Sequence, residues 1–268
     1  MQTWKLTLAY DGSAFRGWQT QPGHYTIQGE LQNALGRILG ETPLPQGSGR
    51  TDAGVHAFAQ VASFDLSVPI PPVNLQRALN RTLPPAIRVL EARTVKSSFH
   101  ARHSAVAKTY EYRILIDPEH LCPPIHAPYV WACPWQLDRA ALDRAAADLV
   151  GEYDFRSFAT SDPDLTARNA EEPANFPPRS TVRTIFHSAW ETRADHLHSL
   201  LIYRVRGNGF LHHMVRNLVG TMVDIGRGFL PPDAIPAILA ARARSAAGPT
   251  APARGLFLHS VEYDPEDL

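Results

Sequence analysis

The stretch Gln46–Ala57 places a single carboxylate, Asp52, in a loop rich in glycine. No large apolar side chain precedes Val55, and glycine allows both positive φ angles and the close approach of a ligand to the backbone. Arg50 lies two residues before Asp52, and a neighbouring guanidinium favours the ionised form of a carboxylate. An ionised aspartate can act as a nucleophile or a general base. The alternative is an Asx-type turn, in which the carboxylate hydrogen-bonds its own backbone.

Other kinds of catalytic site find no support in the motifs. The sequence has no P-loop and no GxGxxG following a predicted strand, which argues against nucleotide cofactors. Its histidines include the pairs His100/His103 and His212/His213, but neither stands in an HExxH frame, so no metal site is expected. There is no GxSxG nucleophile motif, and the Asp52 loop lacks the second carboxylate that a glycosidase acid/base pair needs.

Two distant residues are candidate partners of Asp52. The segment 108–116 alternates like a strand, which puts Tyr110 on the same face as Lys108 and suggests that this end of the face is hydrated. The alternative is that Tyr110 is an ordinary core aromatic. Arg216 directly follows Val215, a member of a helical apolar stripe, so it leaves the helix near the edge of the buried face and can reach across a cleft. The alternative is a solvated arginine.

An aromatic loop near the N-terminus offers a further candidate surface. Phe15, Arg16 and Trp18 lie in a segment punctuated by Gly12 and Gly17. Such a loop can present a platform on which a nucleic-acid base stacks. Alternatively, the aromatic rings close the edge of the core.

The charges are balanced overall but unevenly distributed. The 268-residue chain has a net charge of zero, 44% hydrophobic residues and 19% charged residues, as expected of a folded globular protein. No carboxylate occurs in residues 92–110, which include Arg102 and Lys108, or in residues 196–217. This segregation predicts a basic groove for phosphates, the alternative being ordinary strand-face charges.

The cysteine content and the hydrophobic pattern of the chain indicate the cellular compartment. Cys122 and Cys133 are too few for a disulfide framework and are wrongly spaced for zinc, which favours a reducing environment. The N-terminal residues enter a strand pattern without an apolar signal-like region, and no apolar run reaches membrane length. We therefore expect a cytoplasmic protein without a membrane segment.

The elements that must position these residues follow from periodicity. Strands are predicted at 4–10, 58–64, 87–95, 108–116, 181–190, 197–206 and 256–263, and helices at 27–38, 73–81, 137–149, 211–225 and 231–241. Residues 117–135 hold five prolines and read as a connection between two halves, 1–116 and 136–268. Residues 159–179 read as a long polar loop. Because both halves mix strands and helices, we predict a pseudo-duplicated α+β architecture.

Several blocks, taken together, resemble one known family. The segment Gly49-Arg-Thr-Asp-Ala-Gly-Val-His-Ala57 is similar to the signature of the tRNA pseudouridine synthase A family. Further blocks resemble the family in the same order: 10–19, 99–102, 108–112, 181–183, 207–220 and 251–256. The resemblance spans nearly the whole chain, although the loop 159–179 is longer and more polar than the family pattern.

The resemblance implies a fold and a reaction. The fold would be the pseudouridine-synthase fold: two similar α/β halves, a largely antiparallel mixed sheet flanked by helices, and a central cleft. The reaction would be isomerisation of uridine to pseudouridine at positions 38 to 40 of the tRNA anticodon stem-loop. It would need no cofactor or metal, and a homodimer would bind the tRNA.

By position in the matching blocks, the family's catalytic residues would be Asp52, Tyr110 and Arg216. Tyr110 would stack on the target base and Arg216 would pair with the aspartate. The candidate substrate contacts in these blocks are Phe15, Arg16, Arg50, Arg102, Lys108, Tyr110 and His212. The uridine must leave its stem before its glycosidic bond can be reached, which requires an aromatic partner and a basic clamp.

Two other functions remain open from the residues alone. The segregated charge by itself is also consistent with a non-catalytic tRNA-binding or folding module, which would bind in a salt-sensitive way without forming product. A nucleoside or glycoside hydrolase using Asp52 would release free uracil, but the missing second carboxylate makes it the weakest hypothesis.

Overall fold

The computed structural model describes residues 1–160, 180–194 and 199–268. The predicted loop 159–179 therefore lies, from residue 161 onward, outside the described residues. The strands are β1 (Gln2–Tyr10), β2 (Gln46–Gly47), β3 (His56–Leu66), β4 (Ile87–Val95), β5 (Ala105–Ile116), β6 (Trp131–Cys133), β7 (Gly151–Asp154), β8 (Val182–Ala194), β9 (Ser199–Gly207) and β10 (Leu256–Tyr263). The helices are α1 (Ile27–Leu39), α2 (Pro72–Thr82), α3 (Arg139–Ala147), α5 (Met214–Gly226) and α6 (Ala234–Ala241).

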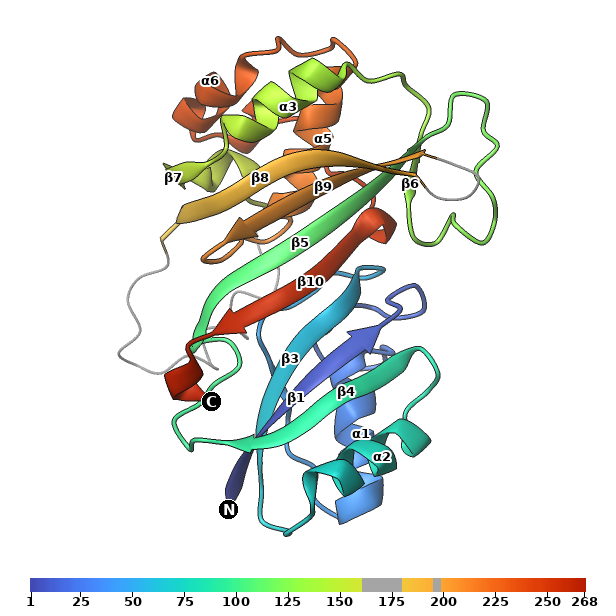
Figure 1. Cartoon of the computed structure of the whole chain (residues 1–268), viewed down its shortest axis with the longest axis vertical. Helices are drawn as coiled ribbons and strands as arrows, with labels where there is room; N and C mark the ends of the chain where they lie inside the picture. The colour runs from blue at the N-terminus through green and yellow to red at the C-terminus, as the bar shows by residue number, and fades with distance from the viewer. Residues whose placement is uncertain (161–179, 195–198) are drawn as a thin grey trace.

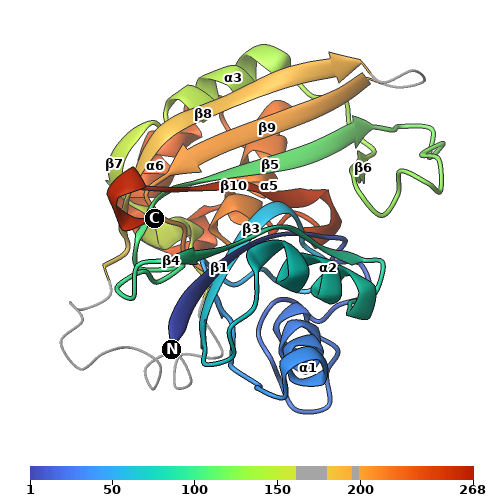
Figure 2. The same ribbon diagram turned by 60° about the horizontal axis from the view of Figure 1, so that its bottom comes forward.

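One large mixed sheet runs through the molecule in the order β4-β1-β3-β10-β5-β9-β8-β7, with β2 added to β3 and β6 added to β5 (Figure 1). All of its pairs are antiparallel except β10 with β3 and β5 with β6. Helices α1 and α2 lie at the β4-β1-β3 end, and α3, α5 and α6 lie at the β9-β8-β7 end (Figures 1 and 2). The predicted α+β architecture with a largely antiparallel mixed sheet is confirmed.

The last strand occupies the middle of this sheet. β10 pairs in parallel with the start of β3, where Phe257 lies opposite His56, and antiparallel with β5, where Leu258 lies opposite Tyr110. It therefore joins the strand that follows the Asp52 loop to the strand that carries Tyr110. The connection 117–135 also contributes a strand, since β6 pairs with the end of β5.

Local sequence signals fix both ends of α1 but not the start of α5. The Thr26 side chain accepts a hydrogen bond from Gly29 N–H at the start of α1, and Gly40 ends that helix in the left-handed conformation at φ 72°. The helix predicted to begin at Leu211 begins instead at Met214. The reason is His213, whose φ of 59° cannot be accommodated inside a right-handed helix.

A continuous core links the two ends of the sheet. Trp4 and Leu6 of β1 and Tyr112 of β5 are fully buried in the same cluster as Leu218 and Met222 of α5. Cross-strand pairs continue the packing, with Tyr112 opposite Tyr203 in the β5–β9 ladder. The strands on one side of the candidate site and helix α5 on the other therefore share one hydrophobic core.

Part of the predicted basic surface is neutralised by strand pairing. Arg204 donates two hydrogen bonds to the carboxylate of Glu111, at 2.9 and 3.2 Å, and Arg206 makes a bidentate pair with Glu262. Glu111 is 1% exposed. The absence of carboxylates from residues 196–217 therefore does not translate into uncompensated positive charge on β9, because acidic partners come from β5 and β10.

Glu111 provides a test of this neutralisation. Burial alone would raise its pKa, but hydrogen bonds from Arg113 and Arg204 outweigh burial and hold the pKa below its ordinary value. We expect Glu111→Gln to lower the free energy of unfolding at pH 7 by about 1.5–3 kcal/mol, the range for hydrogen bonds to charged groups. The stabilisation is present above the ordinary glutamate pKa, so the difference from wild type should shrink as the pH falls below about 4.3.

Thermal and denaturant unfolding at several pH values measures this difference. Glu191→Gln is the matched control, because Glu191 also pairs with Arg204 but its side chain is 43% exposed. An exposed pair contributes about 1 kcal/mol or less. Equal effects of the two variants would show that the burial of Glu111 does not matter.

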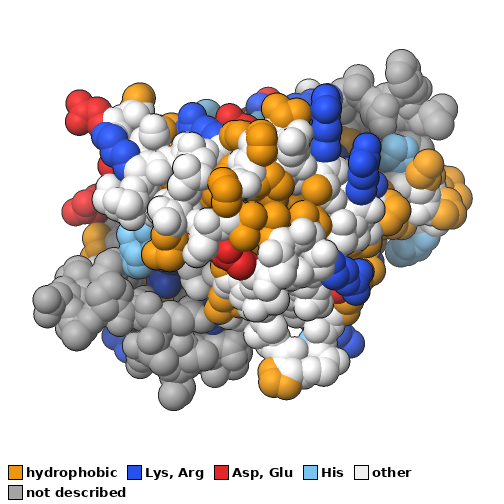
Figure 3. Space-filling model, turned by 90° about the horizontal axis from the view of Figure 1, so that it is seen from below, with side chains coloured by type: hydrophobic (Ala, Val, Ile, Leu, Met, Phe, Trp, Pro, Cys, Tyr) orange, Lys and Arg blue, Asp and Glu red, His pale blue; other side chains and the backbone are white. Residues whose placement is uncertain are grey.

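The end of the molecule that carries α1 and α2 has an apolar surface. Two proline-containing segments, 41–45 and 67–73, lie together there because the backbone N–H groups of Ser67 and Val68 donate to the Glu41 carboxylate. Leu44 and Val73 on these segments are 39% and 53% exposed. Seen from this end, hydrophobic side chains gather in the middle of the face (Figure 3).

No helix among the described residues is long and apolar enough to cross a membrane.

Candidate active site

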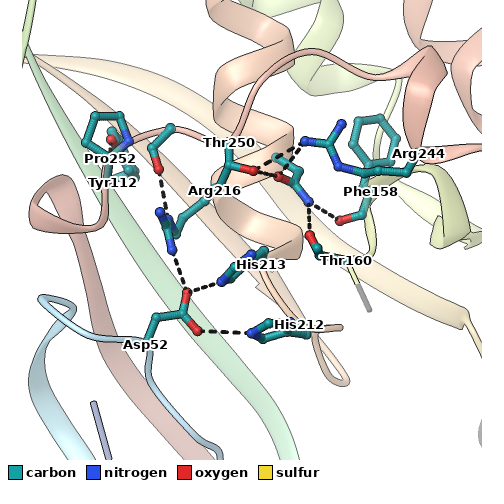
Figure 4. A network of polar contacts seen from close by, with 12 residues as sticks. Asp52, Tyr112, Phe158, Thr160, His212, His213, Arg216, Arg244, Thr250 and Pro252 are labelled. Atoms are coloured by element: carbon teal, nitrogen blue, oxygen red, sulfur yellow. Dashed lines mark hydrogen bonds and ion pairs between the residues drawn. The ribbon is translucent and has the colours of Figure 1, made fainter. Parts of the chain in front are cut away.

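Asp52 lies in the turn that leads into β3. The turn is closed by the backbone, since Val55 N–H donates to the Asp52 carbonyl at 3.1 Å. The carboxylate instead points to the start of α5, where Arg216 Nη1 donates to its Oδ2 at 2.8 Å (Figure 4). The Asp52 side chain keeps 22% of its surface exposed. The Asx-turn interpretation is therefore wrong, and the charge faces outward from its own loop.

Two histidines complete the surroundings of the carboxylate. His213 Nε2 lies 3.3 Å from Asp52 Oδ2, and His212 Nε2 lies 3.7 Å from Oδ1. The two imidazoles stack with centroids 3.8 Å apart. Burial, followed by the charges of His212 and Arg216, lowers the pKa of His213 although Asp52 raises it, which favours the neutral imidazole. The Asp52 carboxylate is thus contacted by the Arg216 guanidinium and by the imidazoles of His212 and His213, and all three side chains come from residues 212–216.

A short segment of chain before β10, residues 249–252, orients the Arg216 side chain; we call this segment the strap. Arg216 Nε donates to the Ala251 carbonyl at 2.8 Å, and Ala251 N–H donates to the Arg216 carbonyl at 3.1 Å. The next residue, Pro252, accepts a hydrogen bond from the Tyr112 hydroxyl at 2.7 Å. The guanidinium is therefore held on two edges, by the strap and by Asp52, and its direction is fixed before substrate arrives.

Asn217 holds the strap from the inside. This residue is fully buried, and its Oδ1 accepts hydrogen bonds from Thr250 Oγ1 at 2.6 Å and from Arg244 Nη2 at 3.1 Å. Its Nδ2 donates to the Phe158 carbonyl at 2.8 Å and to Thr160 Oγ1 at 3.3 Å (Figure 4). All four amide positions of a buried side chain are thereby used, which makes the connection between α5 and the strap rigid.

Gln60 holds the other wall of the site. Its side chain is fully buried and donates to the Gly49 carbonyl at 2.9 Å while accepting from Ser48 Oγ at 2.6 Å. Beside it, the Tyr10 hydroxyl shares a 2.8 Å hydrogen bond with Thr51 Oγ1. Burial raises the pKa of Tyr10 to about 12. The buried side chains of Gln60 and Tyr10 thus hold residues 48–51, which directly precede Asp52.

Lys108 and Tyr110 lie on the β5 side of the same loop. Lys108 is half-buried and its Nζ donates to the Ser48 carbonyl, so the predicted substrate contact is also a support of the loop. Tyr110 is 8% exposed and packs edge-to-face on Phe210 with centroids 5.1 Å apart. Burial, followed by the charges of Tyr10 and Asp52, raises the pKa of Tyr110. Its phenol is therefore neutral at physiological pH and close to the Asp52 carboxylate.

The aromatic loop has a different role from the one predicted. Phe15 is 3% exposed and stacks on Tyr25 at 4.6 Å, so it is a core residue and its rings are not presented to a substrate. The backbone of this loop supports the Asp52 turn instead, because Trp18 N–H donates to the Thr51 carbonyl at 3.0 Å. Gly17, at φ 89°, allows this approach, since a Cβ there would lie 2.7 Å from the Thr51 carbonyl oxygen.

The other predicted substrate contacts are more dispersed. Arg16 is exposed and Arg50 is half-buried next to Asp52 in the chain. Arg102 lies in the connection between β4 and β5, close enough to Arg183 for its charge to lower the pKa of that residue after the effect of burial. His212 is the member of this group that reaches the Asp52 carboxylate.

The profile of the family described as tRNA pseudouridine synthase matches residues 7–104 and 145–264. The chain belongs to the tRNA pseudouridine synthase family. It is 50% identical over 264 residues to a tRNA pseudouridine synthase A of Solibacter usitatus, covering 98% of this chain and 100% of the relative. It is also 45% identical to a tRNA pseudouridine synthase A of Moorella thermoacetica, covering 97% of this chain and 98% of that protein. The predicted family is confirmed, and with it an isomerase acting on tRNA.

Within this tRNA pseudouridine synthase, several residues around Asp52 were not found from the sequence. Gln60, Asn217 and the strap at Ala251 support the site through hydrogen bonds to the backbone or to other supporting side chains, so they leave no catalytic motif. A weak signal exists in the first two, because each is an uncharged polar side chain within a mainly apolar strand or helix. His213 was considered only as half of a histidine pair.

His213 also gives a test of stored strain in this tRNA pseudouridine synthase. Its φ of 59° is a left-handed conformation that costs a non-glycine residue about 1–2 kcal/mol. We expect His213→Gly to be at least as stable as wild type, because glycine adopts this conformation freely. Turnover should fall about tenfold, equivalent to about 1.4 kcal/mol, because the imidazole nitrogen that lies 3.3 Å from Asp52 Oδ2 is removed.

Thermal unfolding and single-turnover kinetics of the same preparation separate the two effects. His213→Asn is the companion variant, since asparagine tolerates this backbone but is shorter than histidine. A His213→Gly protein that turns over like wild type would mean that the imidazole does not assist Asp52.

Proposed function

We propose that this enzyme isomerises uridine to pseudouridine at positions 38 to 40 of the tRNA anticodon stem-loop, with Asp52 as the reacting carboxylate. The observation that carries the proposal is the contact between Asp52 and Arg216, which joins a glycine-rich loop on one side to the start of α5 on the other. The partially exposed Asp52 carboxylate lies between its own loop and the start of α5.

The reaction makes specific demands on such a site. The bond between C1′ and N1 breaks, a bond between C1′ and C5 forms, the C5 proton leaves and N1 gains a proton. Nothing is oxidised or reduced, so the reaction needs no external electron acceptor. Asp52 would act on the ribose, either by attack at C1′ or by removing a proton from C2′. Arg216 would hold the carboxylate so that it points at the sugar.

Tyr110 is proposed to contact the displaced uracil. Its side chain is 8% exposed, and through Leu258 of β10 it is aligned with Ala57 at the start of β3, so a flipped base could stack on what remains open. The neutral phenol would accept or relay the C5 proton only by way of a neighbouring group, because burial raises its pKa. His212, whose Nε2 lies 3.7 Å from Asp52 Oδ1, is near enough to take part in binding the nucleotide.

The RNA backbone is proposed to lie along the remaining basic residues. Arg16, Arg50, Arg102 and Lys108 are the proposed contacts, and a central cleft between the Asp52 loop and α5 would receive the flipped nucleotide. Because these contacts would be electrostatic, single substitutions should weaken tRNA binding and reduce its salt dependence rather than abolish chemistry.

We also propose that the protein is a homodimer in the cytoplasm, as the resemblance to the family implies. The apolar face formed by segments 41–45 and 67–73 supports a second subunit, since exposed apolar patches commonly mark contacts between proteins (Figure 3). Light scattering of the full chain at several concentrations tests the assembly. A monomer throughout would overturn it.

The decisive experiment maps the product. Purified enzyme is incubated with unmodified tRNA without added cofactor, and carbodiimide-treated RNA is sequenced to locate pseudouridine. Tritium release from C5-labelled uridine measures the rate. Pseudouridine at positions 38 to 40 supports the proposal, pseudouridine elsewhere overturns the position, and free uracil would indicate a hydrolase.

A further inference from the structure

The side chains around Asp52 have the composition of a transition-metal site. One oxygen of Asp52 and one ring nitrogen each of His212 and His213 lie within 4.8 Å of one another. Imidazole nitrogen and carboxylate oxygen are the ligands that zinc accepts in open sites with three protein ligands and one free position. Among the residues that the structure describes, this is the one group of three such side chains so placed.

The separations fit the size of such a site. With metal–ligand bonds of about 2.0–2.1 Å, neighbouring ligand atoms in a tetrahedral zinc site are about 3.4 Å apart. The contacts across the site are of this size, although they involve different carboxylate oxygens: His213 Nε2 lies 3.3 Å from Asp52 Oδ2, and His212 Nε2 lies 3.7 Å from Asp52 Oδ1. Small rotations of the side chains would bring all three ligand atoms to bonding distance.

Two features hold these ligands in place without a metal. The imidazoles stack at 3.8 Å, which keeps both Nε2 atoms on the Asp52 side, and Arg216 fixes the carboxylate at 2.8 Å (Figure 4). The side chains of His212 and His213 keep 20% and 24% of their surface exposed, so an ion can enter from solvent. A site that is already assembled costs little ordering free energy on binding.

We propose that Asp52, His212 and His213 bind a divalent transition-metal ion of the zinc class, and that its occupancy blocks the enzyme. The ion neutralises the carboxylate that would act on the ribose and fills the position that the sugar would take. The Arg216 guanidinium, in contact with the same carboxylate, repels a cation and keeps the affinity below that of a resident structural metal. The ion is therefore a reversible inhibitor and not a cofactor.

The binding test uses Co²⁺ as a spectroscopic substitute for zinc, on full-length protein without a histidine tag and without RNA. Visible absorption reports Co²⁺ coordinated by nitrogen and oxygen ligands, and added Zn²⁺ should displace it. We expect one equivalent to bind. Each of His212→Ala, His213→Ala and Asp52→Asn should lose at least about tenfold in affinity, because even outer-shell partners of metal ligands are worth 10–100-fold.

The double variant His100→Ala/His103→Ala is the matched control. These two imidazoles also lie close together, with centroids 4.2 Å apart, but among the residues that the structure describes no carboxylate completes a group of three with them. The control should bind Co²⁺ like wild type. Loss of binding in the control, or wild-type affinity in Asp52→Asn, would overturn the site. Asp52→Asn preserves side-chain shape, so it keeps the test valid if a histidine variant does not fold.

The inhibitory consequence rests on the proposed function of Asp52 and is measured separately. Turnover of tRNA should fall in step with Zn²⁺ occupancy and return after a chelator is added. Full turnover at saturating Zn²⁺ would overturn the inhibition. If wild-type enzyme proves inactive on tRNA, the proposed reaction fails, while the Co²⁺ titration still decides whether the metal site exists.

Discussion

Asp52→Asn is expected to lose turnover on the order of 10⁴-fold, the upper end of what one general base contributes. The carboxamide is neutral and a poor nucleophile, yet it has nearly the shape of the carboxylate. Its oxygen can still accept the hydrogen bond that Arg216 donates to Asp52 Oδ2 at 2.8 Å. The variant should therefore fold and bind tRNA like wild type while failing in the chemical step.

The measurement combines three readouts on one preparation: tritium release under single-turnover conditions, tRNA affinity and thermal unfolding. Asp65→Asn is the control, because Asp65 lies at the far end of β3, the strand that follows the Asp52 turn, is exposed and accepts a hydrogen bond from Thr3. It should retain full activity. An Asp52→Asn enzyme that works at wild-type rate would remove Asp52 from the mechanism.

Gly220→Ala is expected to have the largest effect on stability. Gly220 lies in the middle of α5, where a Cβ would stand 1.7 Å from the Pro249 carbonyl oxygen and 2.9 Å from its carbonyl carbon. Both are backbone atoms of the strap, so no side-chain rotation relieves the overlap. We expect the free energy of unfolding to fall by about 3 kcal/mol or more, at the upper end of the range for overpacking.

The same substitution should also slow the reaction. Moving the strap away from α5 displaces the Ala251 carbonyl, which accepts the hydrogen bond from Arg216 Nε at 2.8 Å. Arg216 would then meet Asp52 at a poorer angle, and misplacement by about 1 Å can cost about 10²-fold in rate. Denaturant unfolding and single-turnover kinetics below the unfolding transition measure the two losses independently.

Gly36→Ala is the matched control, because Gly36 is also inside a helix. A Cβ there would meet only Thr42 Cγ2, at 2.7 Å, and Thr42 is an exposed side chain that can rotate. Alanine is favoured over glycine in a helix interior by about 0.5–1 kcal/mol, so this variant should be as stable as wild type or more so. A similar loss in both variants would show that helix glycine, and not the strap, is responsible.

Local patterns predicted the elements well because they depend only on near neighbours. The alternation of β1, β4 and β10 located those strands within about two residues, and Thr26 and Gly40 marked the ends of α1 through capping chemistry. The start of α6 was predicted at residue 231 instead of Ala234. The start of α5 was also predicted three residues too early. The left-handed conformation of His213 that causes it is imposed by the surroundings and is rare for histidine, so no propensity signals it.

The glycine loop illustrates the limit of sequence reasoning. Its composition located the candidate catalytic carboxylate, since glycines and a lone aspartate are visible in the chain itself. Its supports were hidden, because Gln60 and Lys108 bind backbone carbonyls of residues 48 and 49, and a carbonyl is present at every position of any sequence. Phe15 shows a second limit. Its residue type allows it to stack on a substrate base, and only its burial in the structure shows that it packs in the core.

What the sequence determined by itself was the helices and the long strands, but not the short strands β2, β6 and β7, together with the family and the carboxylate at the centre of the candidate site. What the tertiary structure decided was which charges meet. Arg216 reaches Asp52 across 164 residues, whereas Arg204 and Arg206, equally basic in the sequence, are bound by Glu111 and Glu262. The physical reason is that ion pairing depends on distance and burial, and strand order sets both. By inserting β10 between β3 and β5, the sheet brings Glu262 within reach of Arg206, whereas helix α5 presents Arg216 to the Asp52 loop.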